Sequence, residues 1–558
     1  MFPASATSFS ELFTNPQLAI YFSISILNAV LFLCMSVKFI LVLQLGGYKG
    51  KKYFKWLASP ETPYLSRLML LCLLGLLFFC LLSTCFSFLG VEIASYVGFL
   101  SYLLFSILYI TTEKKMGNKV RLSYTKRVIR LFIVYFFVVI AFTFGLITLI
   151  NFLAFTIKDE VVGIMRYSII CATPLLAPYL LYVASLIVAP FELMVKKYYV
   201  KKATLKLKRS QVLKIGISGS FGKTTVKEIL KSILSQKYRV LATPDSYNTP
   251  LGIALTVNNL DSTHDIFIAE MGARNKGDIK EVAKIVNPMY GVLTGVNSQH
   301  LESFGSMENI KDTKYELFEN LTDGGEGFFC SDNKNALELS ERFKGEKYFA
   351  GTGDYENNLV WATDIVTDWH GTSFNLCIKG EEPVRCATVL LGEHSIRNIC
   401  LAAAVAYKIG MTAKEIAFGI IRIQSVGHRL EIMPNNKGIV IIDDSYNANI
   451  DGAEAAMQVL DMFDGRKIVV TPGLVELGKE ENALNIEYGK MLAKHADKVI
   501  IVGRHNAEMI LSGLIDGGMK KEDIRFAKNL NRGNTELNKM LKAGDIVLFE
   551  NDLPDNYN

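Results

Sequence analysis

Five long apolar segments occupy most of the first 190 residues and constrain this chain more than any other feature. A helix needs about 20 mostly apolar residues to cross the hydrocarbon core of a bilayer. The segments that come near this length are Leu18–Val37, Leu68–Phe88, Ile93–Ile110, Leu131–Phe152 and Ile169–Val188. A secretory signal peptide does not fit, because no Lys or Arg precedes the first segment and further apolar segments follow it. The sequence therefore predicts an α-helical bundle of five membrane spans.

Basic residues are concentrated on alternate connections between these segments. The amino terminus and the second-to-third connection contain none, and the fourth-to-fifth connection contains only Lys158 and Arg166. The basic residues of the other connections are Lys49, Lys51, Lys52, Lys55 and Arg67, then Lys114, Lys115, Lys119, Arg121, Lys126, Arg127 and Arg130, then Lys196, Lys197, Lys201, Lys202, Lys206, Lys208 and Arg209. Because Lys and Arg favour the cytoplasmic side, we expect a multi-pass protein of the cytoplasmic membrane, with its amino terminus outside and everything after Lys196 in the cytoplasm. A six-span bundle is the alternative, and it would place the amino terminus inside despite its lack of basic residues.

The membrane half carries little chemistry of its own. Neither an internal repeat nor a run of buried acids marks a transport pathway, so anchoring to the lipid bilayer and docking are its expected roles. Proline removes a backbone donor and disrupts helices. We therefore expect Pro174 and Pro178 to kink the last span and Pro190 to end it.

Beyond about Lys201 the composition becomes that of an ordinary globular protein. The length of 558 residues suits roughly three domains, and we place a membrane domain at 1–195, a basic linker at 196–210, a central domain at 211–425 and a C-terminal domain at 426–558. The net charge of +6 is small, and no basic stripe with interleaved aromatic residues occurs, so nucleic acid is excluded as a partner. The nine cysteines form no CxxC pair, which predicts reduced thiols in a reducing compartment.

A strand, a glycine-bearing turn and an amphipathic helix are expected over Leu213–Leu230. The turn reads Gly219-Ser-Phe-Gly-Lys-Thr-Thr225, a pattern typical of a phosphate-binding loop. Glycines let backbone N–H groups approach phosphates at a helix N-terminus, the lysine neutralises them, and a threonine hydroxyl can bind magnesium. The expected ATP contacts are Gly219, Ser220, Gly222, Lys223, Thr224 and Thr225. The first glycine of the usual spacing falls on Ile217, so a strand–helix turn that binds no nucleotide is the alternative.

Two further polar residues follow apolar strands. Glu270 ends the strand expected over Ile266–Ala269, and His300 follows the strand expected over Tyr290–Val296. Because ligand-binding groups gather at the carboxyl ends of strands in α/β sheets, Glu270 is expected to hold a magnesium ion that Thr224 also contacts. A solvated acid at a strand end and a structural histidine are the alternatives.

A series of motifs continues along the chain in order. They are Ser246–Gly252, Phe267–Arg274, Gly295–Gly305, Lys311–Phe318, Gly392–Ala404, Gly427–Glu431 and Ile442–Asn449. Together they resemble the Mur ligase family over Val212–Val547, and the last motif is similar to the branch that adds D-alanyl-D-alanine to UDP-N-acetylmuramoyl tripeptide. The resemblance implies an α/β fold with a phosphate-loop central ATPase domain and a Rossmann-like C-terminal ligase domain. It also implies an ATP-dependent carbon–nitrogen ligase that acts through an acyl phosphate in cell-wall or related envelope precursor synthesis.

The resemblance assigns catalytic and metal-binding roles as well. Lys314 matches a lysine that carbon dioxide carbamylates in this family, His300 matches a residue that serves a second magnesium ion, and Asn248 matches an asparagine near the γ-phosphate. The catalytic residues implied are Lys223, Asn248, His300 and Lys314; the metal ligands implied are Thr224, Glu270, His300 and Lys314, with ATP and two Mg²⁺ ions. A solvated lysine on the helix expected over Asn309–Leu321 is the alternative for Lys314, and a turn asparagine is the alternative for Asn248.

Three more residues resemble nucleotide contacts. Asn398 matches an adenine-side asparagine, Arg429 an arginine on the phosphates, and Asp444 an aspartate on the ribose side. Asp444 follows the strand expected over Ile439–Asp443, which opens the C-terminal domain, so ATP would occupy a cleft that closes on substrate. The loop expected to close carries Asn447 and Asn449. Ordinary polar surface residues are the alternative for the three nucleotide contacts.

Several departures from the family pattern concern the substrate. Ser395 and Ile450 stand where asparagine and proline are usual, Thr471–Gly478 keeps only its final Glu-Leu-Gly, and Phe549–Tyr557 replaces a basic segment. Five spans stand where the resembling enzymes carry a UDP-binding domain. We therefore expect an amino-acid or peptide amine and a carboxylate acceptor that is lipid-linked or delivered at the membrane. A membrane-anchored polyglutamate ligase, and an ATP-dependent scaffold or transport subunit, are the alternatives.

Overall fold

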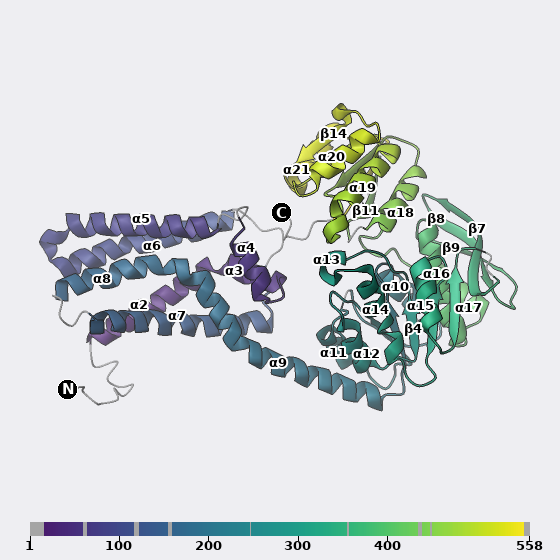
Figure 1. Ribbon diagram of the computed structural model, residues 1–558, viewed down its shortest axis with the longest axis horizontal. Helices are drawn as coiled ribbons and strands as arrows, with labels where there is room; N and C mark the ends of the chain where they lie inside the picture. The colour runs from purple at the N-terminus through teal and green to yellow at the C-terminus, as the bar shows by residue number, and fades with distance from the viewer. Residues whose placement is uncertain are drawn as a thin grey trace. The chain divides into compact units, whose positions relative to one another are not determined.

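The computed structural model describes residues 16–59, 64–115, 122–153, 159–245, 247–353, 356–433, 438–446 and 449–551. The chain forms two compact units, Met1–Lys196 and Lys197–Asn558, whose elements are labelled in Figure 1. Several residues singled out from the sequence lie outside the described ones: the amino terminus, Lys119, Arg121, Lys158, Ser246, Asn447 and the chain end beyond Asn551.

The described part of the first unit consists of helices. They are α2 (Pro16–Met35), α3 (Val37–Leu45), α4 (Gly50–Leu57), α5 (Tyr64–Cys85), η1 (Ser87–Leu89), α6 (Val91–Lys115), α7 (Lys126–Leu153), α8 (Asp159–Ala172), η2 (Thr173–Leu176) and the first part of α9 (Ala177–Arg209). Five stretches are apolar and long enough to cross a membrane: Leu18–Met35, Tyr64–Cys85, Ile93–Glu113, Lys126–Phe152 and Tyr167–Arg209. Each overlaps one segment predicted from the sequence, so the five apolar helices are confirmed.

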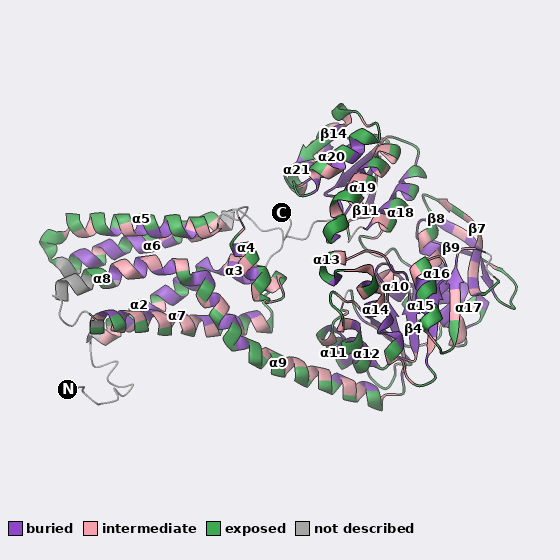
Figure 2. Cartoon of the chain, in the orientation of Figure 1, coloured by how far each residue is buried: buried purple, intermediate pink, exposed green. Residues whose placement is uncertain are grey.

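Helix α5 is apolar both on its buried side and on its exposed side. Leu68, Leu71 and Phe79 are buried, whereas Leu73 and Leu77 are 56% and 60% exposed. Figure 2 shows exposed residues along the whole length of this helix. An exposed leucine stripe of this length is unfavourable in water and is typical of a helix that faces hydrocarbon.

A buried amide connects helices inside the first unit. The Asn28 Nδ2 atom of α2 donates to Thr143 Oγ1 of α7 at 3.0 Å and to Thr173 Oγ1 of η2 at 3.4 Å. The Tyr102 hydroxyl of α6 donates to Asn28 Oδ1. All four side chains are buried. Because an unpaired polar group in an apolar core is costly, these contacts select one arrangement of the helices.

The prolines of the last span act differently from one another. Pro174 lies in the 3₁₀ turn η2, so a break in the helix occurs there as expected. Pro190, which was expected to end the span, lies inside α9, and the helix continues to Arg209. The prediction for Pro190 was wrong: a proline inside a long apolar helix is tolerated when the surrounding structure compensates for the missing backbone bond. The segment 196–210, expected as a linker, is helical through Arg209.

The central domain of the second unit is built on a nine-stranded sheet with the order β2-β3-β1-β4-β5-β6-β7-β8-β9. The strands from β2 to β7 are parallel to their neighbours, and β8 and β9 extend the sheet in antiparallel fashion. The strands are β1 (Leu213–Ser218), β2 (Val240–Ala242), β3 (Ile266–Glu270), β4 (Tyr290–Leu293), β5 (Glu326–Cys330), β6 (Lys347–Gly351), β7 (Asn358–Asp368), β8 (Gly371–Ile378) and β9 (Val384–Thr388). The α/β architecture expected for this region is confirmed.

Helices cover both faces of this sheet. They are α10 (Lys223–Leu234), α11 (Pro250–Asn258), α12 (Asp278–Val286), α13 (Leu301–Phe304), α14 (Met307–Tyr315), η3 (Phe318–Asn320), α15 (Lys334–Arg342), α16 (Glu393–Lys408) and α17 (Ala413–Ile421). Along β3, Ile266 and Ile268 pack with α10, α16 and α17, while Phe267 and Ala269 pack with α11, α12 and α14. The strand is buried on both sides, which explains its continuous apolar sequence.

The C-terminal domain has a six-stranded sheet with the order β10-β11-β15-β12-β13-β14, parallel except for β10. Its strands are β10 (Glu431–Met433), β11 (Val440–Asp444), β12 (Lys467–Thr471), β13 (Lys498–Val502), β14 (Ile524–Ala527) and β15 (Ile546–Glu550). Its helices are α18 (Ile450–Asp461), η4 (Gly478–Glu480), α19 (Glu481–His495), α20 (Ala507–Asp516), η5 (Lys521–Asp523) and α21 (Leu530–Met540).

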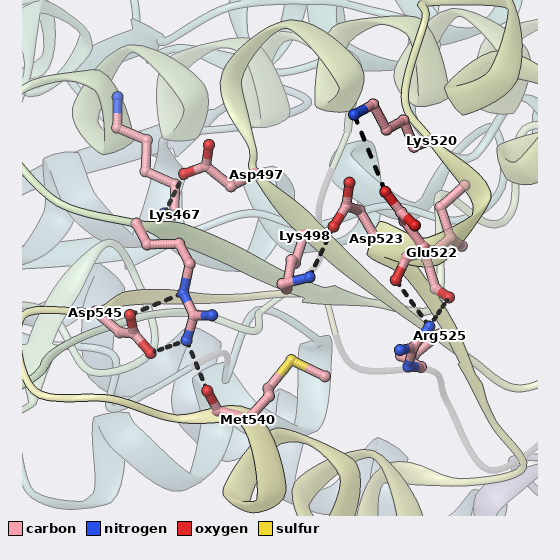
Figure 3. A network of polar contacts seen from close by, with 11 residues as sticks. Lys467, Asp497, Lys498, Lys520, Glu522, Asp523, Arg525, Met540 and Asp545 are labelled. Carbon is pink, nitrogen blue, oxygen red and sulfur yellow. Dashed lines mark hydrogen bonds and ion pairs between the residues drawn. The ribbon is translucent and has the colours of Figure 1, made fainter.

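Ion pairs and hydrogen bonds join the amino ends of these parallel strands (Figure 3). The Arg466 guanidinium, just before β12, donates to both carboxylate oxygens of Asp545, just before β15, at 3.0 and 2.6 Å. Lys498 of β13 lies 2.7 Å from Asp523. This polar network lies at the amino ends of the strands, opposite the carboxyl ends where α/β sheets bind their ligands.

Candidate active site

Three neighbouring strands of the central sheet bring the predicted residues to one edge. In the parallel ladders, Ile217 of β1 pairs with Glu270 of β3, and Ser218 pairs with Leu293 of β4. The segments that follow these strands therefore begin side by side. They contain the turn 219–222, Glu270 itself, and the loop after β4 that leads to His300. The expected clustering at the carboxyl edge is what the fold provides.

The turn between β1 and α10 depends on two glycines. Gly219 has φ of 152°, and a Cβ there would lie 2.1 Å from Thr294 Oγ1; Gly222 has φ of 76°, and its Cβ would lie 2.9 Å from Asn398 Oδ1. The Ser220 N–H donates to the Gly295 carbonyl at 2.7 Å, which fixes the turn against the loop after β4. Because α10 starts at Lys223, its first N–H groups open at this edge, where an anion is favoured.

The Lys223 ammonium lies within the turn. Its Nζ donates to the carbonyls of Gly219 and Ser220, both at 2.8 Å. Burial lowers the pKa of Lys223 to about 8, and the nearby Glu270 carboxylate opposes that shift. A cation held at a helix N-terminus beside open N–H groups is suited to phosphate oxygens.

The Glu270 carboxylate is the centre of a buried polar cluster and is only 1% exposed. Its Oε2 accepts from Thr224 Oγ1 at 2.9 Å, and its Oε1 accepts from Asn248 Nδ2 at 3.1 Å. The backbone N–H of Glu270 donates to Thr243 Oγ1 at 3.1 Å. Glu270 is thus in direct contact with both Thr224 and Asn248, two other residues predicted for the site. The hydroxyl and carboxylate oxygens of Thr224 and Glu270 are the kind of ligands that Mg²⁺ prefers.

Lys227 belongs to this cluster and was missed in the sequence. It is fully buried on α10, with its Nζ 3.4 Å from Glu270 Oε2 and hydrogen-bonded to the Asp245 carbonyl. The only local signal was its position one helical turn after Lys223, on the same side of the helix. Its charge compensates the buried carboxylate of Glu270, which would otherwise be strongly unfavourable.

His300 contacts the C-terminal domain. Its Nδ1 hydrogen-bonds with Glu476, and its side chain is 16% exposed. Arg274 Nη2 lies 3.8 Å from the other Glu476 oxygen, and the Glu302 N–H donates to the Glu476 carbonyl at 3.3 Å. Burial lowers the pKa of His300, and the Glu476 hydrogen bond opposes that shift. Glu476 was not among the predicted site residues, although its Glu-Leu-Gly context was noted.

Lys314 is buried on α14 and only 3% exposed. Its Nζ lies 5.8 Å from the centre of the Phe304 ring. Burial lowers the pKa of Lys314 well below its ordinary value, and the nearby Lys223 charge lowers it further. Burial therefore disfavours the charged ammonium form of Lys314.

The predicted metal ligands do not form a preassembled cluster of acids and histidines. Among the described residues, no group of three or more His, Cys, Asp or Glu side chains is arranged to hold a metal ion. Thr224 and Glu270 are hydrogen-bonded to one another. The Nδ1 atom of His300 is bonded to Glu476, so Nε2 is the ring nitrogen that this contact leaves for a metal ion. A magnesium ion here would need oxygen ligands from a bound phosphate in addition to those of the protein.

A cavity of about 320 Å³ adjoins the turn and is lined by both domains of the second unit. Gly222, Thr225 and Asn398 line it from the central domain, and Arg429 and Asp444 line it from the C-terminal side. These five predicted nucleotide contacts share the cavity, whereas the other four, Gly219, Ser220, Lys223 and Thr224, are not among its lining residues. The Arg429 guanidinium lies over the Tyr446 ring, 4.5 Å from its centre. Burial raises the pKa of Asp444 to about 6, and the Arg429 charge opposes that shift.

A second polar contact joins the domains beside this cavity. Asn297 Nδ2 donates to Asn449 Oδ1 at 2.9 Å and to Asp451 Oδ2 at 2.7 Å. Asn449 also accepts from the Gly452 N–H and so caps the N-terminus of α18. The predicted contribution of Asn449 to the closing loop thus has a specific partner in the central domain.

Comparison with known proteins relates both domains to one family. Residues 217–406 match the Mur ligase middle domain, and residues 428–550 match the Mur ligase, glutamate ligase domain. The UDP-N-acetylmuramoyl-tripeptide–D-alanyl-D-alanine ligase of Escherichia coli (strain K12) is 31% identical over 296 residues, which cover 52% of this chain and 65% of that protein. The ligase of the same name from Bacillus subtilis (strain 168) is 29% identical over 347 residues, covering 60% of this chain and 72% of that protein.

Solved structures agree with this assignment. The MurF ligase of Thermotoga maritima in complex with ADP is 26% identical with a TM-score of 0.57, over 64% of this chain and 80% of that one. A MurF structure from Acinetobacter baumannii is 25% identical with a TM-score of 0.58, over 64% of this chain and 77% of that one. The chain spans just under two thirds of the Escherichia coli relative, and its apolar first unit lies before both matched regions. Through its central and C-terminal domains, this chain belongs to the Mur ligase family.

Proposed function

We propose that this protein is an ATP-dependent ligase that joins a carboxylate to an amine in the synthesis of a peptidoglycan precursor or a related envelope precursor. One observation carries the proposal: the Thr224–Glu270 contact and the Lys223 ammonium in the adjacent turn adjoin the cavity lined by Asn398, Arg429 and Asp444. The names of the relatives, which describe the addition of D-alanyl-D-alanine to a UDP-N-acetylmuramoyl tripeptide, support the same reaction class.

The chemistry requires activation of the carboxylate, because an oxide ion is a poor leaving group. Phosphoryl transfer from ATP gives an acyl phosphate and ADP. The amine nitrogen then attacks the acyl carbon, the C–N bond forms, and phosphate leaves as the nitrogen loses its proton. Both steps gather negative charge, so positioned cations and N–H donors provide most of the stabilisation.

Each predicted residue at the carboxyl edge of the central sheet has a role in this scheme. The α10 N-terminus and its turn (Gly219, Ser220, Gly222 and Thr225) bind the phosphates, and Lys223 exchanges its two carbonyl partners for phosphate oxygens. Asn248 orients Glu270 and reaches toward the γ-phosphate and the acyl group. In the cavity, Asn398 contacts the adenine, Arg429 the phosphates and Asp444 the ribose. The two sheet domains here form a phosphate-loop ATPase and a Rossmann-like ligase domain.

The residues present fit magnesium at one position. Thr224 and Glu270 offer adjacent oxygens, and a bound ion would neutralise charge on the transferred phosphoryl group. His300 Nε2 and a carbamylated Lys314 are the proposed ligands for a second ion. The burial of Lys314 and the lowered pKa of its amine suit carbamylation by carbon dioxide, because burial favours the neutral amine that reacts and shields it from bulk water.

We place the first unit in the cytoplasmic membrane, with the amino terminus outside and the second unit in the cytoplasm. The five apolar helices and the alternation of basic connections support this topology. Because one span is enough for anchoring, the additional spans favour a carboxylate substrate that is lipid-linked or delivered at the membrane.

The test uses the full-length protein in lipid nanodiscs, with ATP, Mg²⁺ and bicarbonate. UDP-N-acetylmuramoyl tripeptide or a lipid extract supplies the carboxylate, and D-alanyl-D-alanine supplies the amine. We expect ADP release that depends on both substrates and a product heavier by one dipeptide minus water. A ladder of products would instead identify a polyglutamate-type ligase, and ATP hydrolysis without any new amide bond would contradict the ligase proposal.

A further inference from the structure

The short helix α4 has a charged face that neither the proposed ligase chemistry nor the packing of the first unit uses. Lys51, Lys52 and Lys55 are exposed, and none of them has an ion-pair partner among the described residues. Because each residue turns a helix by roughly 100°, these lysines lie on one side of α4, opposite Tyr53 and Leu57, which are buried. A short helix divided in this way is typical of a membrane surface.

Aromatic contacts fix the other face of α4 to the start of α9. The Tyr53 hydroxyl donates to the Pro178 carbonyl at 3.1 Å. The Tyr53 ring stacks on the Tyr182 ring with centroids 6.2 Å apart, and the Phe54 ring meets Tyr182 edge-on at 4.8 Å. A Cβ atom at Gly50 would overlap the Tyr182 hydroxyl, so the two helices pack closely. The lysines of α4 therefore project from a helix that is held in one position.

A second basic connection of the first unit reaches the same region. The Gln44 side chain, at the end of α3, exchanges two hydrogen bonds with the Ser123 backbone, at 2.9 and 3.2 Å. The Arg127 guanidinium lies over the Tyr48 ring, 3.6 Å from its centre. These contacts join the turn between α3 and α4 to the start of α7, where Lys126 is exposed. Figure 1 shows α3 and α4 together at one end of the helix bundle.

No acid within these segments balances the charge. The segments 46–59 and 122–127 contain no Asp or Glu, and their basic residues, defined here as the basic surface, are Lys49, Lys51, Lys52, Lys55, Lys126 and Arg127. In the first unit, Glu113 and Glu192 already pair with Arg67 at 2.8 Å and with Arg130 at 2.6 Å. Glu61 lies outside the described residues. The basic surface thus presents uncompensated positive charge.

We propose that the basic surface binds the anionic head groups of phospholipids in the cytoplasmic leaflet. Phosphate oxygens are suitable partners for lysine ammonium groups, and basic segments beside a membrane are attracted to anionic lipids. A signal for membrane orientation depends on the number of basic residues in a connection and needs no fixed helix, whereas α4 holds its lysines in place through Tyr53 and Phe54. The inference rests on the proposed membrane placement of the first unit and is independent of the ligase reaction.

The experiment uses the full-length protein in a neutral detergent and follows the fluorescence of Trp56, which is next to Lys55 on α4 and partly exposed. The probes are short-chain phosphatidylglycerol and phosphatidylcholine, both with brominated acyl chains that quench tryptophan. We expect phosphatidylglycerol to quench Trp56 at a concentration at least roughly tenfold lower, because it alone carries a net negative charge. Trp56→Phe measures the background from Trp361 and Trp369.

The lysines are tested by the double variant Lys51→Gln and Lys55→Gln. It should raise the concentration of phosphatidylglycerol needed for half-quenching roughly tenfold and leave the value for phosphatidylcholine unchanged. The matched control is the double variant Lys201→Gln and Lys202→Gln, which removes the same charge from exposed positions of α9 and should change neither value. Circular dichroism of each variant confirms that the helices are retained.

Equal quenching of the unaltered protein by the two lipids would overturn the inference, because the lysines of α4 would then serve only to orient the chain. An equal loss of affinity in the α9 variant would also overturn it, since total charge rather than the basic surface would attract the lipid. Neither readout involves amide formation, so both outcomes leave the ligase proposal intact. Release of the protein from membranes by alkaline carbonate would contradict the membrane placement, and the inference would fall with it.

Discussion

The buried polar groups of the two units follow different rules. In the first unit, the neutral Asn28 amide is paired with three hydroxyl groups from other helices and carries no charge. In the second unit, Glu270 is equally buried but charged, and Lys227, Thr224 and Asn248 surround it. A neutral network holds helices together, whereas a compensated ion keeps polar atoms in place for a charged ligand. The difference separates structural polarity from functional polarity within one chain.

The sharpest test removes the cation at the phosphate-binding turn. Lys223→Ala should lower ADP release on the order of 10²-fold or more, because a preorganised positive charge at the transferred phosphoryl group is lost. Thermal unfolding should change little, since Lys223 is bonded only to carbonyls of its own turn. Lys237→Ala, an exposed lysine after α10, is the control. A fully active Lys223→Ala variant would contradict a catalytic role for Lys223 and would make it a structural polar residue like Asn28.

The Lys314→Ala variant tests whether Lys314 is carbamylated and acts as a metal ligand in that form. Lys314→Ala should lower activity by about 10²-fold, and small carboxylic acids such as formate or acetate should restore part of it by replacing the carbamate. Bicarbonate depletion should affect the unaltered protein and leave the variant unchanged. Full activity of Lys314→Ala without added acid would remove Lys314 from the proposed metal site.

Lys227 should affect both stability and catalysis. Lys227→Met leaves Glu270 without its buried cation and should cost about 3 kcal/mol of unfolding free energy, together with a roughly tenfold loss of activity. Adding Glu270→Gln should restore part of the stability while activity stays low. Thermal unfolding and ADP release are measured for both single variants and the double variant. Additive effects of the two changes on the unfolding free energy would contradict the proposed pairing of Lys227 with Glu270.

Glu550 is the exception within the second unit, because it resembles the neutral network of the bundle. It is fully buried at the end of β15, accepts from the Tyr488 hydroxyl, and its Oε1 has no hydrogen-bond partner among the described residues. Burial raises the pKa of Glu550 to about 8; the Tyr488 hydrogen bond opposes this shift, and the nearby Asp444 charge adds to it. A raised folded-state pKa gives stability that is complete below the ordinary pKa of 4.5 and is lost as the pH rises through about 8.

Glu550→Gln should therefore raise the melting temperature at pH 7 to 8 and have little effect near pH 5. The expected gain at pH 7 is up to about 3 kcal/mol, because glutamine needs no proton to remain neutral. Glu508→Gln, an exposed acid on α20, should show no such pH dependence. A gain that is equal at pH 5 and pH 8 would contradict a protonated Glu550.

The smallest effect is expected in the bundle. Asn28→Leu should reduce stability by about 1–2 kcal/mol, because Thr143, Thr173 and Tyr102 lose their shared partner. Titration of the full-length protein with SDS, followed by circular dichroism, measures the change. Ser23→Ala on the same helix is the control, since Ser23 bonds only to a carbonyl of its own turn. Equal stability of the Asn28→Leu and Ser23→Ala variants would contradict the proposal that Asn28 holds the helices together.

Local patterns predicted much of this molecule. The apolar segments predicted all five long apolar helices to within a few residues at most ends, and the glycine spacing after β1 predicted the turn, Lys223 and Thr224. Glu270 followed from its position at the end of an apolar strand. Each of these features depends on residues close together in sequence, where hydrophobic period and turn chemistry act directly.

Contacts between residues far apart in the sequence were harder to predict. Glu476 reaches His300 across 176 positions, and the Glu-Leu-Gly that it begins gave no indication of this partner. Lys227 is buried only because Glu270 and Asp245 lie beside α10 in the folded protein. Pro190 was misjudged because its cost depends on the surrounding structure rather than on the proline itself.

The loop after β4 has a consequence for the timing of turnover. Asn297, His300 and Glu302, which all bond to the C-terminal domain, lie within six consecutive residues. The covalent connection between the domains is on a different segment, around residues 422–429. In the proposed ligase, separating the domains around the nucleotide cavity requires these hydrogen bonds to break, while the covalent connection stays intact. We therefore expect the strength of this short loop's contacts to influence how long ADP stays bound, so that product exchange and bond formation can evolve separately.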